Sequence, residues 1–239
     1  CGQAKPEDRS VSTTVAIDGP AASGKSTVAR LLASRLEGFY INTGDMYRTV
    51  TWQAQARGID LESDGPAVVA MLDDLSLAYE LSPEGVPELH LNGSVVPPDR
   101  IRNATVTRQV SYAARIPGVR IWMRSRQRDS RSLGTVVMEG RDIGTVILPD
   151  APHKFFITAS PEVRARRRLG QEGETDAGAT VAAVAAEIAE RDRIDSTRAV
   201  APLKPADDAL IINTDALTAE QVVDKIMASI EGGERGRRG

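Results

Sequence analysis

Residues 15–28 read Val15-Ala-Ile-Asp-Gly19-Pro-Ala-Ala-Ser-Gly-Lys25-Ser26-Thr-Val28, and this stretch decides the fold. From Gly19 to Ser26 it fits G-x-x-x-x-G-K-[ST], the phosphate-binding loop of proteins that use ATP or GTP. The apolar run before the loop predicts a buried strand, and the apolar stripe after it predicts a helix. This order of elements predicts a polyphosphate site, because backbone N–H groups and the positive end of the helix dipole face the anion.

Two side chains of this loop have predicted roles in phosphoryl transfer. Lys25 is expected to reach the β- and γ-phosphates, and the Ser26 hydroxyl is expected to ligate Mg²⁺. The alternative is a glycine-rich turn that matches by chance, but the flanking strand and helix favour a nucleotide site. The loop alone does not indicate which reaction the nucleotide serves.

Composition sets the broad class of the protein. The chain has 239 residues, enough for one sizeable α/β domain with insertions or at most two small domains. With 41% hydrophobic and 26% charged residues, its composition is typical of a globular protein. A net charge of -3 favours neither nucleic acid nor membrane as a partner, and the single cysteine fits a reducing compartment. No apolar run approaches the ~20 residues of a membrane span, and residues 1–12 lack the apolar core of a signal peptide. We therefore expect a cytoplasmic protein, and a monomer.

Alternating strands and helices predict an α/β fold, with a parallel sheet covered by helices on both faces. The predicted strands are Val15–Asp18, Phe39–Asn42, Thr135–Glu139, Lys154–Thr158 and Ala209–Asn213. The predicted helices are Ser26–Leu36, Met46–Arg57, Val119–Arg128, Pro161–Leu169, Thr180–Arg191 and Thr218–Ile230. Thr218 and Gln221 form a capping box at the start of the last helix.

Two stretches interrupt this alternation within one predicted domain, residues 13–230. Residues 74–118 hold short alternating runs around a Ser-Pro-Glu-Gly turn, which predicts a small antiparallel insertion. Residues 164–190 hold a polar loop flanked by arginines, which predicts a mobile lid over phosphates. The alternative to a lid is a solvated, charged helix end. The tails, residues 1–12 and 231–239, are expected to be disordered.

Charged residues follow two predicted strands, at the edge where doubly wound sheets bind ligands. Arg48 lies one turn into the next helix and is suited to clamp an acceptor phosphate. Glu139 is placed to hold Mg²⁺ through water. Arg141 and Asp142 offer a cation for phosphate beside a carboxylate for a base or hydroxyl.

A third cluster lies farther along the chain. Arg191, Asp195 and Arg198 share one face of a helix if the helix continues that far, and they would suit a ribose and a phosphate. For each of the three clusters the alternative is a structural ion pair.

The chain resembles the bacterial cytidylate kinases, of the nucleoside monophosphate kinase group. The resemblance rests on AIDGPAASGKST, NTGDMYR, VSYAARIPGVR, EGRDIGTVILPDAP, RARRR, ERDRIDSTRAVAPL and DALIINTD, which span most of the chain. It implies a P-loop kinase fold with a five-stranded parallel sheet, a monophosphate-binding insertion and a lid. It also implies transfer of the γ-phosphoryl group of ATP to CMP and dCMP with Mg²⁺, in pyrimidine nucleotide metabolism.

The resemblance further implies roles at matching positions. ATP would be held by Gly19, Pro20, Ala21, Ala22, Ser23, Gly24, Lys25, Ser26 and Thr27. The acceptor sugar would contact Thr43, Arg191 and Asp195, and the acceptor phosphate would contact Arg48, Arg141 and Arg198. Lys25, Arg141 and Arg198 would form the catalytic group, and Ser111, Arg120 and Asp142 would read cytosine. The chemistry agrees, because a carboxylate accepts from the N4 amino group of cytosine, whereas uracil presents an acceptor there.

Two residues depart from the family pattern. Asn42 stands where Asp is common, which puts in doubt a supporting role toward Mg²⁺ or phosphate. Asp45 stands where a small residue is common, and would weaken monophosphate binding unless Arg48 or solvent offsets its charge. We also expect His90 and His153 to be strand or surface residues without metal.

Two other functions remain as alternatives. A related small-molecule kinase would use a different acceptor, against which the base-reading residues and the insertion argue. A GTP-dependent switch would need a guanine-reading N-K-x-D run, which the sequence lacks.

Overall fold

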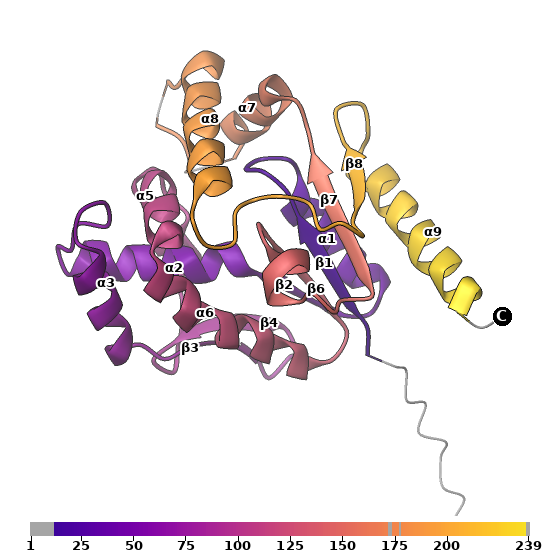
Figure 1. Cartoon of the computed structure of the whole chain (residues 1–239), viewed down its shortest axis with the longest axis horizontal. Helices are drawn as coiled ribbons and strands as arrows, with labels where there is room; N and C mark the ends of the chain where they lie inside the picture. The colour runs from indigo at the N-terminus through magenta and orange to yellow at the C-terminus, as the bar shows by residue number, and fades with distance from the viewer. Residues whose placement is uncertain (1–11, 172–173, 177, 238–239) are drawn as a thin grey trace, which may run out of the picture.

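The computed structural model describes residues 12–171, 174–176 and 178–237, and its main sheet has five parallel strands in the order β2-β6-β1-β7-β8 (Figure 1). The strands are β1 (Thr14–Asp18), β2 (Phe39–Asn42), β6 (Val136–Gly140), β7 (His153–Thr158) and β8 (Leu210–Asn213). All five predicted strands are confirmed, each to within one residue of its predicted ends. Of the two tails that the sequence predicted to be disordered, residues 1–11 and 238–239 lie outside the described residues.

The helical elements beside this sheet are α1 (Lys25–Arg35), η3 (Ile143–Ile147, a π-helical turn), α7 (Pro161–Leu169), α8 (Val181–Thr197) and α9 (Ala219–Arg237). Strand β1 pairs with β6 on one side and β7 on the other, and each of its residues is buried. Val28 of α1 and Ile226 of α9 pack on one face of the sheet, and Ile143 of η3 packs on the other. The phosphate loop therefore leaves the sheet from its most enclosed strand.

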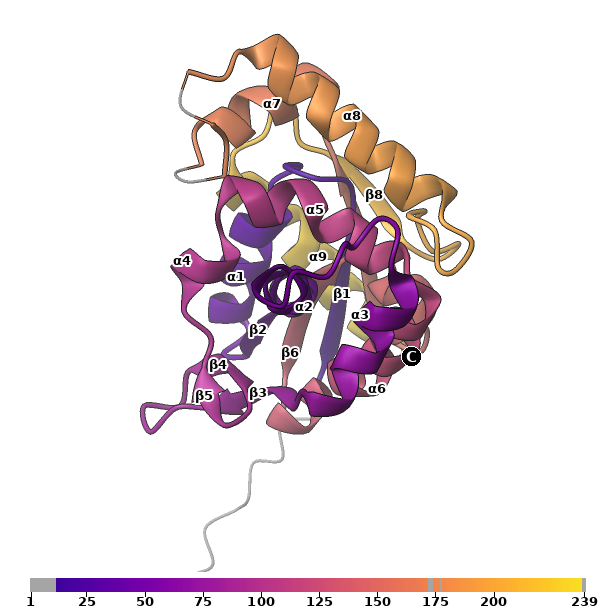
Figure 2. The ribbon, with the colours of Figure 1, turned by 90° about the vertical axis from the view of Figure 1, so that its left-hand side faces the viewer.

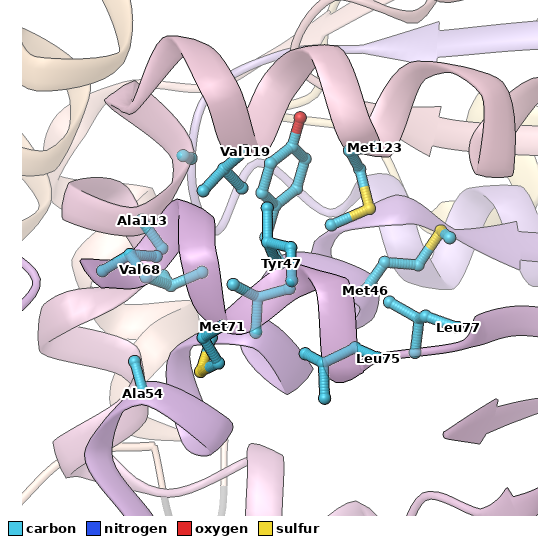
Figure 3. Close-up of a cluster of buried hydrophobic side chains, with 14 of the residues drawn as sticks. Met46, Tyr47, Ala54, Val68, Met71, Leu75, Leu77, Ala113, Val119 and Met123 are labelled. Carbon is cyan, nitrogen blue, oxygen red and sulfur yellow. The ribbon is translucent and has the colours of Figure 1, made fainter. Parts of the chain in front are cut away.

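A second unit forms between β2 and β6. It comprises α2 (Thr43–Ala56), α3 (Gly65–Met71), η1 (Leu72–Asp74), β3 (Leu77–Leu81), β4 (Pro87–Leu91), β5 (Ser94–Val95), α4 (Pro98–Ile101), α5 (Ala104–Arg115), α6 (Pro117–Asp129) and η2 (Ser130–Leu133). Strands β3, β4 and β5 form the antiparallel sheet that the sequence predicted. Figure 3 shows Tyr47 of α2 pointing toward Val119 and Met123 of α6, within a core separate from those of the main sheet.

Helix α5 was not predicted, although its sequence carries the signals of a helix. The Asn103 side chain caps it by accepting from the N–H of Val106 at 3.0 Å. Val106, Val110 and Ala113 then bury one face. The β-branched residues of this stretch concealed the pattern, because valine and threonine favour strands when taken singly. Packing against α2 and α6 overrides that preference.

Helices α7 and α8 lie side by side beyond the end of the sheet that carries the phosphate loop (Figures 1 and 2). Ala165 of α7 packs with Val184 and Ile188 of α8. Helix α8 continues to Thr197, past its predicted end at Arg191, so Arg191 and Asp195 share one face of it. Arg198 lies directly after the helix in an extended conformation, so the prediction that all three residues share a helix face is wrong for Arg198. Helix α9 likewise continues to Arg237, past its predicted end at Ile230. Across the described part of the chain, no helix is both long and apolar enough to cross a membrane.

Candidate active site

The phosphate loop is shaped by two glycines with positive φ. Gly19 has a φ of +149°, and a Cβ built there would lie 2.0 Å from the carbonyl oxygen of Ile157 on β7. Gly24, directly before α1, has a φ of +95°. Glycine adopts such values without the steric cost of a side chain. The loop therefore turns tightly from β1 into α1 while lying against β7.

A cavity of about 100 Å³ lies against this loop, and half of the residues that line it are charged. Its cations are Lys25, Arg48, Arg102, Arg141, Arg168 and Arg191, and its carboxylates are Glu139 and Glu174. Six cations thus face two carboxylates. Since buried charge is costly unless it is paired, this cavity is suited to a polyphosphate.

The pKa values of these cations reflect the crowding. Burial, followed by the positive charge of Arg141, holds the pKa of Lys25 well below its usual value. Burial and neighbouring arginines lower the pKa of Arg191 to about 9. The Lys25 ammonium donates to the carbonyl oxygen of Pro20 at 2.5 Å and to the Ser23 hydroxyl at 3.3 Å. It therefore already lies inside the loop.

A second cavity, of about 350 Å³, adjoins the other side of the loop. Leu217 and Val222 contribute apolar walls to it. Arg167 of α7 crosses from this cavity to the loop, donating to the backbone oxygen of Ser23 at 3.1 Å and to the Thr214 hydroxyl at 2.9 Å. Apolar walls next to a phosphate loop suit the flat base of a donor nucleotide.

Oxygen ligands for a divalent cation gather beside Lys25. Ser26 and Glu139 both line the polyphosphate cavity. The Tyr40 hydroxyl on β2 donates to the Glu139 carboxylate and is also hydrogen-bonded to Ser26. A hydroxyl and a carboxylate are hard oxygen ligands, of the kind that Mg²⁺ takes together with substrate phosphates. The donor set therefore fits the predicted cation. Tyr40 itself was missed, because a tyrosine in a strand gives no sign of such a role.

Asp142 lies at the other end of the site, directly after β6. One of its carboxylate oxygens accepts from Arg120 of α6, and the other accepts from Arg198 at 3.3 Å. None of these three side chains belongs to a residue more than 7% exposed. Ser111 of α5 shares with Asp142 a small cavity of about 40 Å³. The structure thus brings together the three predicted cytosine readers, and it adds Arg198, which was expected at the acceptor phosphate.

The predicted sugar-binding residues line the same small cavity. Asp195 accepts from Arg141 at 2.9 Å. Burial alone would raise the pKa of Asp195, but Arg141, Arg191 and a third arginine together hold it below its usual value. Thr43 donates to a backbone carbonyl of β6 at 2.8 Å, which fixes the first turn of α2 at this edge of the sheet.

Arg48 lies on α2, apart from the Asp142 group. Its guanidinium donates to the Thr107 hydroxyl at 2.8 Å and to Glu174 at 3.1 Å. Glu174, between α7 and α8, also pairs with Arg168 and lies 3.7 Å from Arg102. One carboxylate therefore occupies a cluster of three arginines. No sequence signal singled out Glu174, because acidic residues in polar loops usually face solvent.

The charge of Asp45, one of the two departures from the family pattern, is offset by Arg102, which donates to it at 2.6 Å. We expected Arg48 or solvent to supply this offset, and the charge of Arg48 does favour the ionised form of Asp45, but less than Arg102 does. Arg102 follows α4, whose position the sequence did not predict. The backbone carbonyl of Asn42, the other departure, accepts from the Tyr79 hydroxyl at 3.0 Å.

Asp18, the last residue of β1, was not predicted to take part in the site. Its carboxylate accepts from the backbone N–H groups of Ile143 and Gly144, both at 2.8 Å. Burial raises its pKa to about 7, although these hydrogen bonds oppose the shift. The contact joins the strand that feeds the phosphate loop to the turn that follows Asp142. An aspartate at the end of an apolar strand was the available signal, since a buried carboxylate needs partners.

A wider cavity of about 620 Å³ opens between α5 and α8. It shares Ser111 with the small cavity at Asp142, and Arg168 with the polyphosphate cavity. His90 and His153 lie outside these cavities, in β4 and β7, and are strand residues as predicted.

The family model and the curated relatives that match this chain agree on one family. A family model described as cytidylate kinase matches residues 15–232. A cytidylate kinase of Bacillus licheniformis is 43% identical over 217 residues, which cover 91% of this chain and 95% of that protein. A cytidylate kinase of Pelotomaculum thermopropionicum is 47% identical over 221 residues, covering 92% and 97%. Among solved structures, an uncharacterized protein from Eubacterium ventriosum matches with a TM-score of 0.51 at 14% identity, covering 92% of this chain and 99% of that one, which bears on the fold alone.

Proposed function

Because the chain belongs to the cytidylate kinase family and is an ATP-dependent kinase of CMP and dCMP, we propose that the site described above carries out this reaction with the following residues. The reaction transfers the γ-phosphoryl group of ATP to the acceptor phosphate and yields ADP with CDP or dCDP. One observation carries the assignment: Arg141 and Arg191 line both the polyphosphate cavity and the cavity at Asp142. Donor and acceptor phosphates bound in these cavities would therefore meet between the same two cations.

At the donor end, the loop from Gly19 to Thr27 holds ATP, and Lys25 compensates the charge of the transferring group. Ser26 would hold Mg²⁺ directly, and Glu139 would hold it through water. When bound, Mg²⁺ neutralises charge on the β- and γ-phosphates. Tyr40 holds the Glu139 carboxylate toward Ser26 and so keeps these two proposed Mg²⁺ ligands close together.

At the acceptor end, Arg48, Arg141 and Arg198 hold the phosphate of CMP, and Thr43, Arg191 and Asp195 hold its sugar. The acceptor phosphate is already a good nucleophile, so no side chain needs to be activated to attack. Catalysis then depends on in-line placement and on compensation of charge. Both are properties of the buried arginine cluster.

The base is read by Ser111, Arg120 and Asp142. The Asp142 carboxylate accepts from the N4 amino group, and the other two donate to N3 and O2. Uracil places its O4 acceptor against that carboxylate, which leaves buried groups mispaired. We further propose that the protein is a monomer and that it works in the cytoplasm. The single cysteine fits a reducing compartment and so supports the location.

A coupled assay with ATP, Mg²⁺ and each common nucleoside monophosphate tests the activity. We expect CMP and dCMP to be the preferred acceptors, and preference for another acceptor would favour a related small-molecule kinase.

Asp142→Ala tests the base assignment. It should lower kcat/KM for CMP more than for UMP, and so narrow their ratio by about tenfold or more, the size of one well-formed contact to a base. Equal losses for both acceptors would mean that Asp142 only supports the loop.

A further inference from the structure

The turn after β6 begins with two backbone N–H groups that its own helix does not use. The N–H groups of Val146 and Ile147 donate to the carbonyl oxygen of Asp142. The N–H groups of Ile143 and Gly144 come before these bonds. The first amides of a helical segment have no partner within it and must be satisfied from outside.

Asp142 occupies the cap position of this turn but does not cap it with its side chain. Aspartate is among the residues that most readily cap, because its carboxylate accepts from the N–H groups two or three positions ahead. Here the carboxylate points instead to Arg120 and Arg198. Asp18 of β1 makes the bonds that the amides of Ile143 and Gly144 require, one to each carboxylate oxygen.

We infer that Asp18 is a positioning residue for acceptor recognition, which caps the turn in place of Asp142 and so leaves the Asp142 carboxylate free to face the acceptor base. The inference rests on the proposed role of Asp142 in reading cytosine. The geometry supports it, because both hydrogen bonds to the Asp18 carboxylate are 2.8 Å long and each uses a different carboxylate oxygen. Asp18 also directly precedes Gly19, so one side chain ties the acceptor turn to the strand that feeds the donor loop.

Removing Asp18 should send the Asp142 carboxylate back to its own turn. In Asp18→Ala, we expect Asp142 to accept from an N–H of η3, which keeps the turn folded but withdraws the carboxylate from the base. The kcat/KM ratio of CMP to UMP should fall by about tenfold or more, with a smaller change in KM for ATP. A crystal structure of the variant should show Asp142 turned away from Arg120.

A double-mutant cycle separates positioning from general support of the fold. In an Asp142→Ala background, Asp18→Ala should change the CMP-to-UMP ratio by less than about twofold, because no carboxylate remains to be placed. It should lower the melting temperature more than it does alone, because no side chain remains to replace the cap. Asp64→Ala is the matched control, because Asp64 accepts from the N–H of Ala67 at 3.1 Å to cap α3. This substitution should leave the CMP-to-UMP ratio of kcat/KM unchanged.

Several outcomes would overturn the inference. These are an unchanged CMP-to-UMP ratio in Asp18→Ala, equal effects of Asp18→Ala in the presence and absence of Asp142, or an unmoved Asp142 in the crystal structure. A failure of Asp142→Ala alone to narrow the ratio would refute the base-reading proposal instead, and the position of Asp142 in the Asp18→Ala crystal would still decide the capping role. If Asp18→Ala does not fold, Asp18→Asn takes its place. If neither folds, NMR of the unaltered protein should detect couplings across the hydrogen bonds from the Ile143 and Gly144 amides to the Asp18 carboxyl carbon, and their absence would refute the contact.

Discussion

Lys25 is a buried cation whose charged form is favoured only when a negatively charged ligand binds beside it. Lys25 is only 5% exposed, and burial and the positive charge of Arg141 both lower its pKa. A lowered pKa means that the folded protein without ligand disfavours the charged form of this lysine. A polyphosphate would reverse that balance, since it brings the compensating negative charge.

Lys25→Ala should therefore lower kcat by about 100-fold or more, the size expected for loss of a charge-stabilising donor, without lowering the melting temperature. The stability follows from removing a buried charge that its neighbours disfavour. Steady-state kinetics and thermal unfolding check the two parts. Lys225→Ala, on the exposed face of α9, is the control. Turnover like that of the unaltered protein would rule out the phosphate-loop mechanism.

Between α7 and α8, a short segment places Glu174 inside the arginine cluster that we assign to acceptor phosphate. Glu174 is 7% exposed and pairs with Arg48 and Arg168. A phosphate that binds Arg48 must displace this carboxylate. The segment thus satisfies the arginines in the free protein and competes with the substrate for them.

Glu174→Gln should lower KM for CMP by about threefold to tenfold, in the range of one ion pair, and should lower the melting temperature of the free protein. KM falls because the CMP phosphate no longer competes with a carboxylate for the arginines. The melting temperature falls because the arginines of the free protein lose their ion-pair partner. Acceptor titrations at saturating ATP measure the first effect. Asp176→Asn is a matched control, since Asp176 pairs with Arg108 at an exposed site. A KM for CMP that stays the same or rises would make Glu174 a supporting partner of the site.

On the scale of the chain as a whole, the site is assembled from three separate units. The main sheet brings the phosphate loop and Asp142, the unit between β2 and β6 brings Ser111 and Arg120, and α8 brings Arg191 and Asp195. The cavity of about 620 Å³ between α5 and α8 leaves room for these two helices to approach each other. Closure around both substrates would exclude water from the transfer.

Hydrogen exchange should therefore slow in α5, α7 and α8 when ATP and CMP are added together, and more than with either substrate alone. Each substrate alone would fill only one of the two cavities that Arg141 and Arg191 share. Exchange in the later part of α9, around Ile226 and Ile230, provides the internal reference, because these residues pack in the core with α1 and line none of the cavities described. Unchanged exchange in α5 and α8 with both substrates would mean that the site is fully formed before they bind.

The sequence by itself determined the main sheet, the phosphate loop and the family. These follow from local patterns: apolar runs of strand length, a glycine-rich loop with Lys25 and Ser26, and a capping box at Thr218 that the structure reproduces in both directions. Such signals depend on residues near one another in the chain. They are therefore readable without knowing what packs against them.

Only the tertiary structure decided which charges meet. Asp45 is offset by Arg102, Asp142 is held between Arg120 and Arg198, and Asp18 caps a turn 125 residues away in sequence. Each pairing joins elements that are distant along the chain, and the energy of a charge depends on its burial and on every neighbour. The sequence did not predict helix α5 because its valines take their conformation from the helices that they pack against, which are distant along the chain.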